Sequence, residues 1–181
     1  MIPNKQNNPI RFAVWFIGLF LVFYYFNILF FGLTTPGGNY SPFLAGYLNY
    51  IAVLRWILLK CSASVLSCWG FTAITNNYEL LVAGRSSIVL VYSCLGLGVV
   101  SFFTAFVLAY PKPRKAKIVF LISGILGIEF LNVIRFVVLA LFWDKRPGTI
   151  IDHHTIFNIF IYIVISACLY FWVKNDVAVK K

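Results

Sequence analysis

Three polar side chains stand apart in an apolar chain: the thiol of Cys94, the guanidinium of Arg135 and the imidazole of His154. A guanidinium inside a membrane helix is costly to insert, so an arginine there is read first as a functional residue. A nearby cation raises the thiolate fraction of a cysteine, and the thiolate is the nucleophile. Arginine can hold an oxyanion and histidine can transfer protons. These residue types predict nucleophilic catalysis by cysteine, provided that the fold brings them together.

The composition indicates a membrane protein. Of the 181 residues, 61% are hydrophobic and 11% are charged, whereas soluble domains carry about a quarter charged residues. The net charge is +10, but the basic residues form short clusters between apolar runs. Such clusters are typical of cytoplasmic membrane loops and speak against a nucleic-acid partner. We therefore expect a single domain of the all-α class, an integral membrane helical bundle whose surroundings are the lipid bilayer.

The four cysteines are Cys61, Cys68, Cys94 and Cys168, and none forms a CxxC pair. Zinc-ribbon and thioredoxin-type sites therefore have no support, and we expect neither a metal nor a cofactor. The first two would lie about 10 Å apart along a helix, too far for a disulfide. Cys168 lies among apolar residues and is expected to pack.

Apolar runs long enough for a bilayer of about 30 Å predict about four membrane spans. They cover residues 11–33, 94–110, 118–143 and 153–173. The first run follows a polar segment without an evident cleavage site, which predicts an uncleaved anchor.

Residues 43–70 are apolar but carry Arg55 and Lys60 near the middle. Each cation would cost about 2.5–3.5 kcal/mol at the bilayer centre. An outer amphipathic or re-entrant helix with snorkelling cations is therefore expected, and a further span is the open alternative. Residues 71–92 are rich in Thr, Val, Ile and Tyr, which predicts a small extracytoplasmic strand or β-hairpin-like unit.

The segment PKPRKAK at 111–117 holds four cations in seven residues and should lie in the cytoplasm. The span that precedes it then begins outside, at Cys94, and the next span ends outside. His154 would open the last span from the same side, and both chain termini would be cytoplasmic. Arg135 lies about 12 Å below the outer end of its helix, and its long side chain can extend upward.

Each residue also has a plain structural interpretation. A cysteine at a helix end usually packs, and a histidine at the interface often anchors a helix. Arg135 can pair with Glu129 or bond to Asn132, three residues earlier on its own helix face. The placement of all three candidates on one side of the membrane favours a shared site.

Three segments resemble, in order, motifs of the exosortase/archaeosortase family over about residues 40–175. YSCLGLG at 92–98 resembles its Cys-x-Gly motif, LNVIRFVVLALF at 131–142 its Asn-Val-x-Arg helix, and HHTIFN at 153–158 its final His motif. The resemblance implies a membrane-embedded cysteine transpeptidase. Cys94 would be the nucleophile, Arg135 the anion-stabilising group and His154 the acid and base. The supporting residues would be Gly96, Glu129, Asn132, His153 and Asn158.

The substrates implied are exported proteins with a C-terminal sorting tail: a short motif, a transmembrane helix and a basic cluster. The chain departs from the family at Leu95, where Ser is frequent, and at Asn158, where Gly is frequent. Transfer and hydrolysis therefore both stay open, and His153 is a rival for the histidine role. The alternative function is a non-enzymatic membrane scaffold for surface-protein or polysaccharide export, with Arg135 paired to Glu129. A solute carrier has less support, since no internal repeat is evident.

Overall fold

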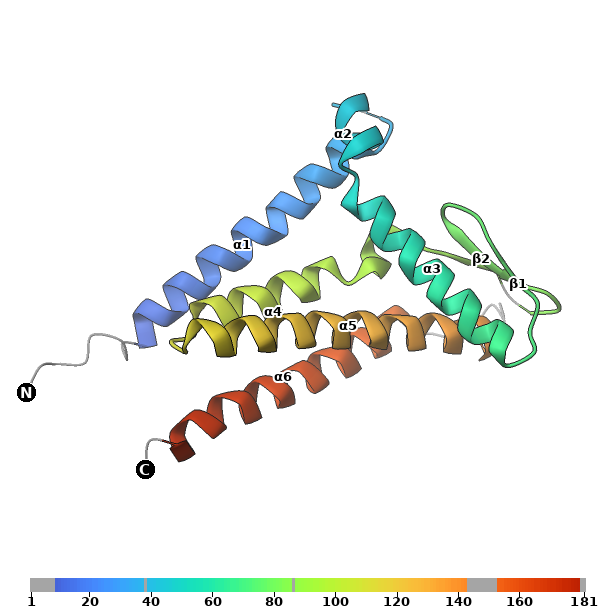
Figure 1. The fold of residues 1–181 in the computed structure, drawn as a ribbon. Coiled ribbons are helices and arrows are strands. Elements are labelled where there is room, and N and C mark those ends of the chain that lie inside the picture. Colours follow the sequence, from blue (N-terminus) through green and yellow to red (C-terminus); the bar gives the residue numbers. More distant parts are fainter. Residues whose placement is uncertain (1–8, 38, 86, 143–152, 180–181) are drawn as a thin grey trace, which may run out of the picture. The chain divides into compact units, whose positions relative to one another are not determined.

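The computed structural model describes residues 9–37, 39–85, 87–142 and 153–179. The fold is mostly helical, with one small sheet (Figure 1). Its elements are α1 (Pro9–Thr34), α2 (Pro42–Tyr47), α3 (Tyr50–Cys68), β1 (Ala73–Thr75), β2 (Glu79–Val82), β3 (Ser87–Val89), the 3₁₀ turn η1 (Tyr92–Leu95), α4 (Leu97–Ala109), α5 (Arg114–Phe142) and α6 (His153–Val179). The chain divides into two compact units, Met1–Trp143 and Asp144–Lys181, and α6 belongs to the second.

Helices α1 and α4 pack antiparallel through aromatic rings. Phe12 meets Phe106 edge-on at 5.4 Å between ring centroids, and Phe16 meets Phe102 in the same way at 5.3 Å. Such pairs contribute about 0.5–1.5 kcal/mol each beyond the area that they bury. These contacts align the beginning of α1 with the end of α4.

Helices α4 and α5 approach closely where Gly124 lies against the ring of Phe103. A Cβ at this glycine would overlap the ring. Small residues allow helix backbones to approach in this way. Pro111 and Pro113 precede α5, and a proline restricts the residue before it to extended conformations, which separates the two helices.

The core of the first unit lies between α3, α5, η1 and the sheet. On α3 the buried side chains recur at helical spacing: Ile51, Arg55, Leu58, Leu59, Ser62 and Leu66. The four apolar ones, Ile51, Leu58, Leu59 and Leu66, meet Phe136, Val137 and Ala140 of α5 and Leu80 and Val82 of β2 in one hydrophobic cluster. Asn49 caps α3 by accepting a hydrogen bond from the backbone N–H of Ala52 at 3.0 Å.

The segment expected to be strand-like forms a three-stranded antiparallel sheet of order β1-β2-β3. Leu80 and Val82 point into the core while Leu81 is exposed, the alternation of a strand with one buried face. The Asn76 side chain accepts hydrogen bonds from the N–H groups of Tyr78 and Glu79, at 2.8 and 2.7 Å, and so closes the first turn. The expected hairpin-like unit is thus a hairpin of β1 and β2 to which β3 adds a third strand.

The structure modifies the expectations for the helices. Among the residues that it describes, three helical stretches are long and apolar enough to cross a membrane: Pro9–Thr34, Pro42–Cys68 and Arg114–Phe142. The helix expected over 94–110 begins only at Leu97 and has 13 residues, about 20 Å in length. The four-span arrangement and its orientation stay predictions.

Arg55 does not extend toward the surface as expected, because it lies on the core face of α3. Its side chain is 7% exposed, and its guanidinium stacks over the ring of Tyr78, 4.5 Å from the centroid. A cation over an aromatic face is stabilised by the ring electrons. Lys60 is exposed, so the two cations of this segment lie in different environments.

Candidate functional site

Cys94 lies in η1, before α4 rather than in it. Its N–H donates to the carbonyl of Val91 at 2.9 Å. Gly96 follows with φ of +69°, a left-handed conformation that separates η1 from α4 and that glycine adopts without strain. The Cys94 side chain is 2% exposed and belongs to the hydrophobic core, so it is buried rather than placed at an open helix end.

The backbone at Gly96 lies directly against Asn132 of α5. A Cβ on this glycine would come within 2.6 Å of Asn132 Nδ2. The fully buried Asn132 side chain donates from Nδ2 to Oε2 of Glu129 at 3.1 Å. Among the described residues, its Oδ1 has no hydrogen-bond donor. The fold thus brings together three residues that the sequence analysis named as supporting, from two distant segments.

Arg135 lies on the same face of α5 as Asn132, three residues further along. Its side chain is 1% exposed, so the guanidinium is enclosed by protein instead of extending to the outer end of the helix as expected. Cys94 belongs to the same cluster as Phe136 and Val137, the two residues after Arg135. Both side chains are buried, and the close approach of Gly96 to Asn132 brings the end of η1 against α5 three residues before Arg135. We call this region the η1–α5 junction, defined by Cys94, Gly96, Glu129, Asn132 and Arg135.

The histidine motif lies in the second unit, at the beginning of α6. The backbone of α6 begins at His153, which puts His154 in its first turn. The side chains of His153, His154 and Asn158 lie outside the described residues. Their predicted roles therefore stay predictions.

A hydrogen-bonded chain beside the junction was not singled out from the sequence. Tyr50 Oη donates to Asn27 Oδ1 at 2.6 Å, and Asn27 Nδ2 donates to Ser101 Oγ at 3.1 Å. These bonds connect α3, α1 and α4 in turn. Asn27 is the one amide side chain in the apolar stretch 12–31 of α1. A polar residue in such a stretch could have been identified from the sequence, since polar side chains often connect membrane helices.

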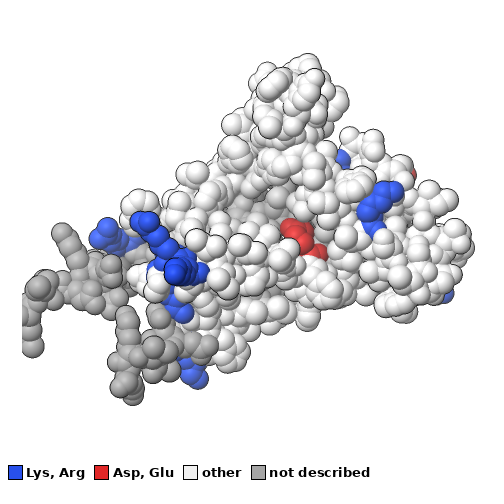
Figure 2. Space-filling model, viewed as in Figure 1, with Lys and Arg blue, Asp and Glu red and all other residues white. Residues whose placement is uncertain are grey.

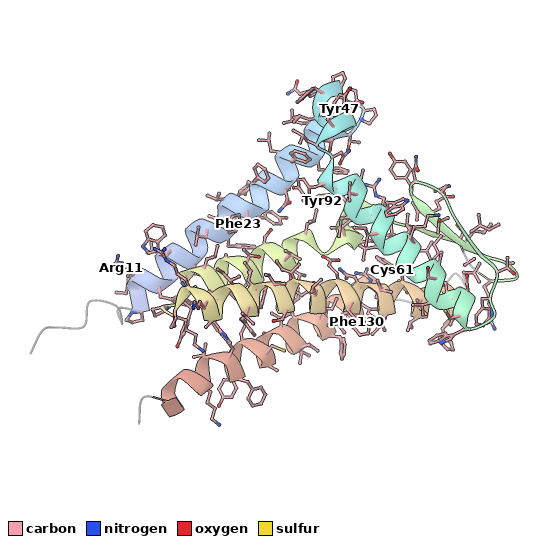
Figure 3. All side chains as sticks on the ribbon, viewed as in Figure 1. Arg11, Phe23, Tyr47, Cys61, Tyr92 and Phe130 are labelled. Carbon is pink, nitrogen blue, oxygen red and sulfur yellow. The ribbon has the colours of Figure 1, made fainter. Side chains whose placement is uncertain are left out.

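Tyr92 precedes Cys94 by two residues and lies where α1 and α3 diverge (Figure 3). Its ring packs on Phe31, with centroids 4.5 Å apart. Burial, and to a smaller extent Tyr24, raise the pKa of the Tyr92 phenol above its ordinary value. The hydroxyl is therefore protonated at neutral pH and can donate a hydrogen bond beside the junction.

Within the part of the chain that the structure describes, no cluster of three His, Cys, Asp or Glu side chains could hold a metal. The side chains of the junction are a thiol, a guanidinium, an amide and a carboxyl group. Comparisons of the chain with family models, with curated proteins and with solved structures find no match.

Proposed function

We propose that the chain is an exosortase-like cysteine transpeptidase, with Cys94 as nucleophile, Arg135 as anion-stabilising group and His154 as acid and base. One observation carries the proposal: Gly96, of the Cys motif, lies against Asn132, of the Arg motif. Only glycine permits so close an approach at a positive φ. Two motifs far apart in sequence thus meet through a contact that side chains would block.

The reaction begins when Cys94 transfers its proton to His154 and its sulfur attacks the carbonyl carbon of a substrate peptide bond. The carbonyl oxygen becomes an oxyanion, which Arg135 stabilises with its two-pronged guanidinium. As the C–N bond breaks, His154 returns the proton to the leaving amine and a thioester remains. An acceptor nucleophile then loses its proton to His154 and attacks the thioester. The acyl group leaves Cys94, which recovers the proton.

Asn132 would act beside these groups as a positioning residue. Its amide is held by Glu129, so its Oδ1 has a defined direction. This oxygen is buried and lacks a donor among the described residues, and leaving such an oxygen unbonded costs about 1–3 kcal/mol. A backbone N–H of the substrate would satisfy it and orient the scissile bond.

The burial of Cys94 sets a condition on access. At 2% exposure, the thiol is reached only when the residues around η1 separate, and the substrate would then exclude water from the reacting groups. We place this reaction at the outer face of the cytoplasmic membrane. The four cations between residues 111 and 117, just before and at the beginning of α5, face the cytoplasm in this arrangement. The partners would be exported proteins with a C-terminal motif, a membrane helix and a basic tail.

The test is the electrophoretic mobility of a tail-bearing substrate in membranes that carry each variant at equal abundance. Cys94→Ala and Cys94→Ser should lower processing roughly 100-fold or more, because alanine has no nucleophile and the hydroxyl of serine is a poor one near neutral pH. Arg135→Lys should be severely impaired, because an ammonium cannot reproduce the planar fork. His154→Ala should lose processing, and His153→Ala should be milder. The matched control is Cys61→Ala, an exposed cysteine on α3, which should process normally.

A scaffold without enzymatic activity is the second candidate, and the position of Cys94 in the hydrophobic core favours it. In that case Cys94 packs, and Arg135 and Glu129 would form a structural pair within the membrane. The Cys94→Ala variant, present in normal amounts, would then support export as well as the unmodified chain does. Unchanged substrate processing by Cys94→Ala would reject the transpeptidase.

A further inference from the structure

A groove opens where α1 begins and α4 ends, away from the η1–α5 junction. Its volume is about 560 Å³, and it is lined by Arg11, Phe12, Trp15, Leu19, Leu108, Ala109 and Pro111. We propose that this groove binds one anionic phospholipid, with the phosphate on Arg11 and an acyl chain along the apolar walls. The site is independent of the proposed catalytic function.

The walls of the groove are apolar and held in position. The ring of Phe12 contacts Phe106 and Tyr110 edge-on, with centroids 5.4 and 6.1 Å apart. Trp15 is 57% exposed beside it, and tryptophan prefers the level of lipid headgroups. The fixed ring of Phe12 suits contact with an acyl chain, and the exposed indole of Trp15 suits contact with the ester region of the lipid.

The mouth of the groove is positively charged. Arg11 is exposed, Lys112 lies in the α4–α5 connection, and the first turn of α5 adds Arg114, Lys115 and Lys117. Figure 2 shows Lys and Arg side chains gathered at this end of the first unit. Lys117 donates to the carbonyl of Leu108 at 2.6 Å, which holds this cation beside the groove wall. Among the described side chains the acidic ones are Glu79 and Glu129, and both lie on other parts of the fold.

The order of residues along α1 matches the order of groups in a phospholipid. Arg11, Trp15 and Leu19 follow one another at one-turn intervals, and the first and last are about 12 Å apart along the axis. The guanidinium of Arg11 therefore lies level with the lipid phosphate, and the indole of Trp15 lies level with the ester groups. Leu19 lies level with the upper part of the acyl chain. Arginine binds phosphate with two parallel hydrogen bonds. A free phosphate would use the cation alone and leave the apolar lining unoccupied.

The experiment is native mass spectrometry of the full chain in detergent, titrated with phosphatidylglycerol or phosphatidylcholine that carry identical acyl chains. We expect one retained phosphatidylglycerol, bound at least tenfold more tightly than phosphatidylcholine and more weakly at high salt. Arg11→Gln should reduce this affinity at least fivefold. Lys60→Gln is the matched control, because Lys60 is an exposed cation on α3 and does not line the groove. It should bind as the unmodified chain does.

Three results would overturn the lipid site. They are equal affinity of Arg11→Gln and the unmodified chain, equal affinity for the two lipids, and binding of glycerol phosphate as tight as that of phosphatidylglycerol. The last would indicate a site for small anions. If Arg11→Gln does not fold, quenching by brominated phosphatidylglycerol decides. The tryptophan fluorescence of the unmodified chain should be quenched more than that of Trp15→Phe. Equal quenching of the two would show that the lipid does not bind in the groove.

Discussion

Gly96 and Asn132 are the residues on which the η1–α5 junction depends. The glycine has a φ of +69°, and its Cα faces the amide of Asn132 without a side chain between them. The amide in turn bonds to Glu129. A change at Gly96 therefore affects the backbone of η1 and the orientation of Asn132 together.

Gly96→Ala should destabilise the protein more than Gly84→Ala. Both glycines have a positive φ, +69° and +71°, so both substitutions carry a strain of about 1–2 kcal/mol. Only at Gly96 would the new Cβ also meet a buried side chain, while the space around Gly84 is open. Thermal unfolding in detergent measures the difference, and processing of a tail-bearing substrate should fall for Gly96→Ala alone. Equal unfolding temperatures for the two variants would show that the contact with Asn132 is unimportant.

At the scale of elements, polar bonds supplement apolar packing between helices. Tyr50, Asn27 and Ser101 connect α3, α1 and α4, and Arg85, between β2 and β3, connects the sheet to α5. Arg85 Nη1 donates to the carbonyl of Leu141 at 3.0 Å. That carbonyl belongs to the last turn of α5, where a cation is favoured by the helix dipole. Each helix beside the junction is thus tied to another element.

Tyr50→Phe should lower the free energy of unfolding by about 0.5–1.5 kcal/mol, the usual contribution of one hydrogen bond. The variant keeps the ring that packs on Phe30 at 4.6 Å and removes only the hydroxyl that donates to Asn27. The matched control is Tyr47→Phe on α2, because Tyr47 is 82% exposed (Figure 3). Chemical denaturation in detergent gives both values. A loss as large for Tyr47→Phe would mean that the network does not stabilise the helices.

At the scale of the whole molecule, the predicted orientation places the sheet outside the cytoplasm and the beginning of α5 inside. Both regions carry exposed positions that suit chemical probes, Ala83 after β2 and Lys115 in the first turn of α5. Leu80 is unsuitable because it is fully buried. The basic cluster and the groove below it would then face the leaflet that is rich in anionic lipid.

A membrane-impermeant thiol reagent should label Ala83→Cys on intact cells and Lys115→Cys only after permeabilisation. The background is a chain in which Cys61, Cys68 and Cys168, which are exposed, are replaced by alanine. The expectation follows from the four cations between residues 111 and 117. If the reagent does not label Ala83→Cys on intact cells, Pro42–Cys68 crosses the membrane and the sheet is cytoplasmic. The site predicted at the outer face would then be wrong.

Length, apolar runs and turn signals predicted part of the secondary structure of this chain. They predicted long apolar helices near residues 11–33 and 118–143 and strand structure over 71–92, because these depend on local composition and spacing. The 3₁₀ turn that ends at Gly96 also depends on local sequence. The positive φ of this glycine becomes evident only when the structure shows that α4 begins at the next residue.

Contacts between distant elements were decided by the tertiary structure alone. The apolar composition of residues 43–70 did not reveal that Arg55 faces the core, because that depends on where Tyr78, in the turn between β1 and β2, lies. Asn132 and Gly96 were named separately, and their contact arises from the approach of η1 to α5. Arg135 was expected to extend outward, but the packed side chains around α5 enclose it. A motif can name the reactive groups, whereas their burial and partners depend on packing between helices that are far apart in sequence.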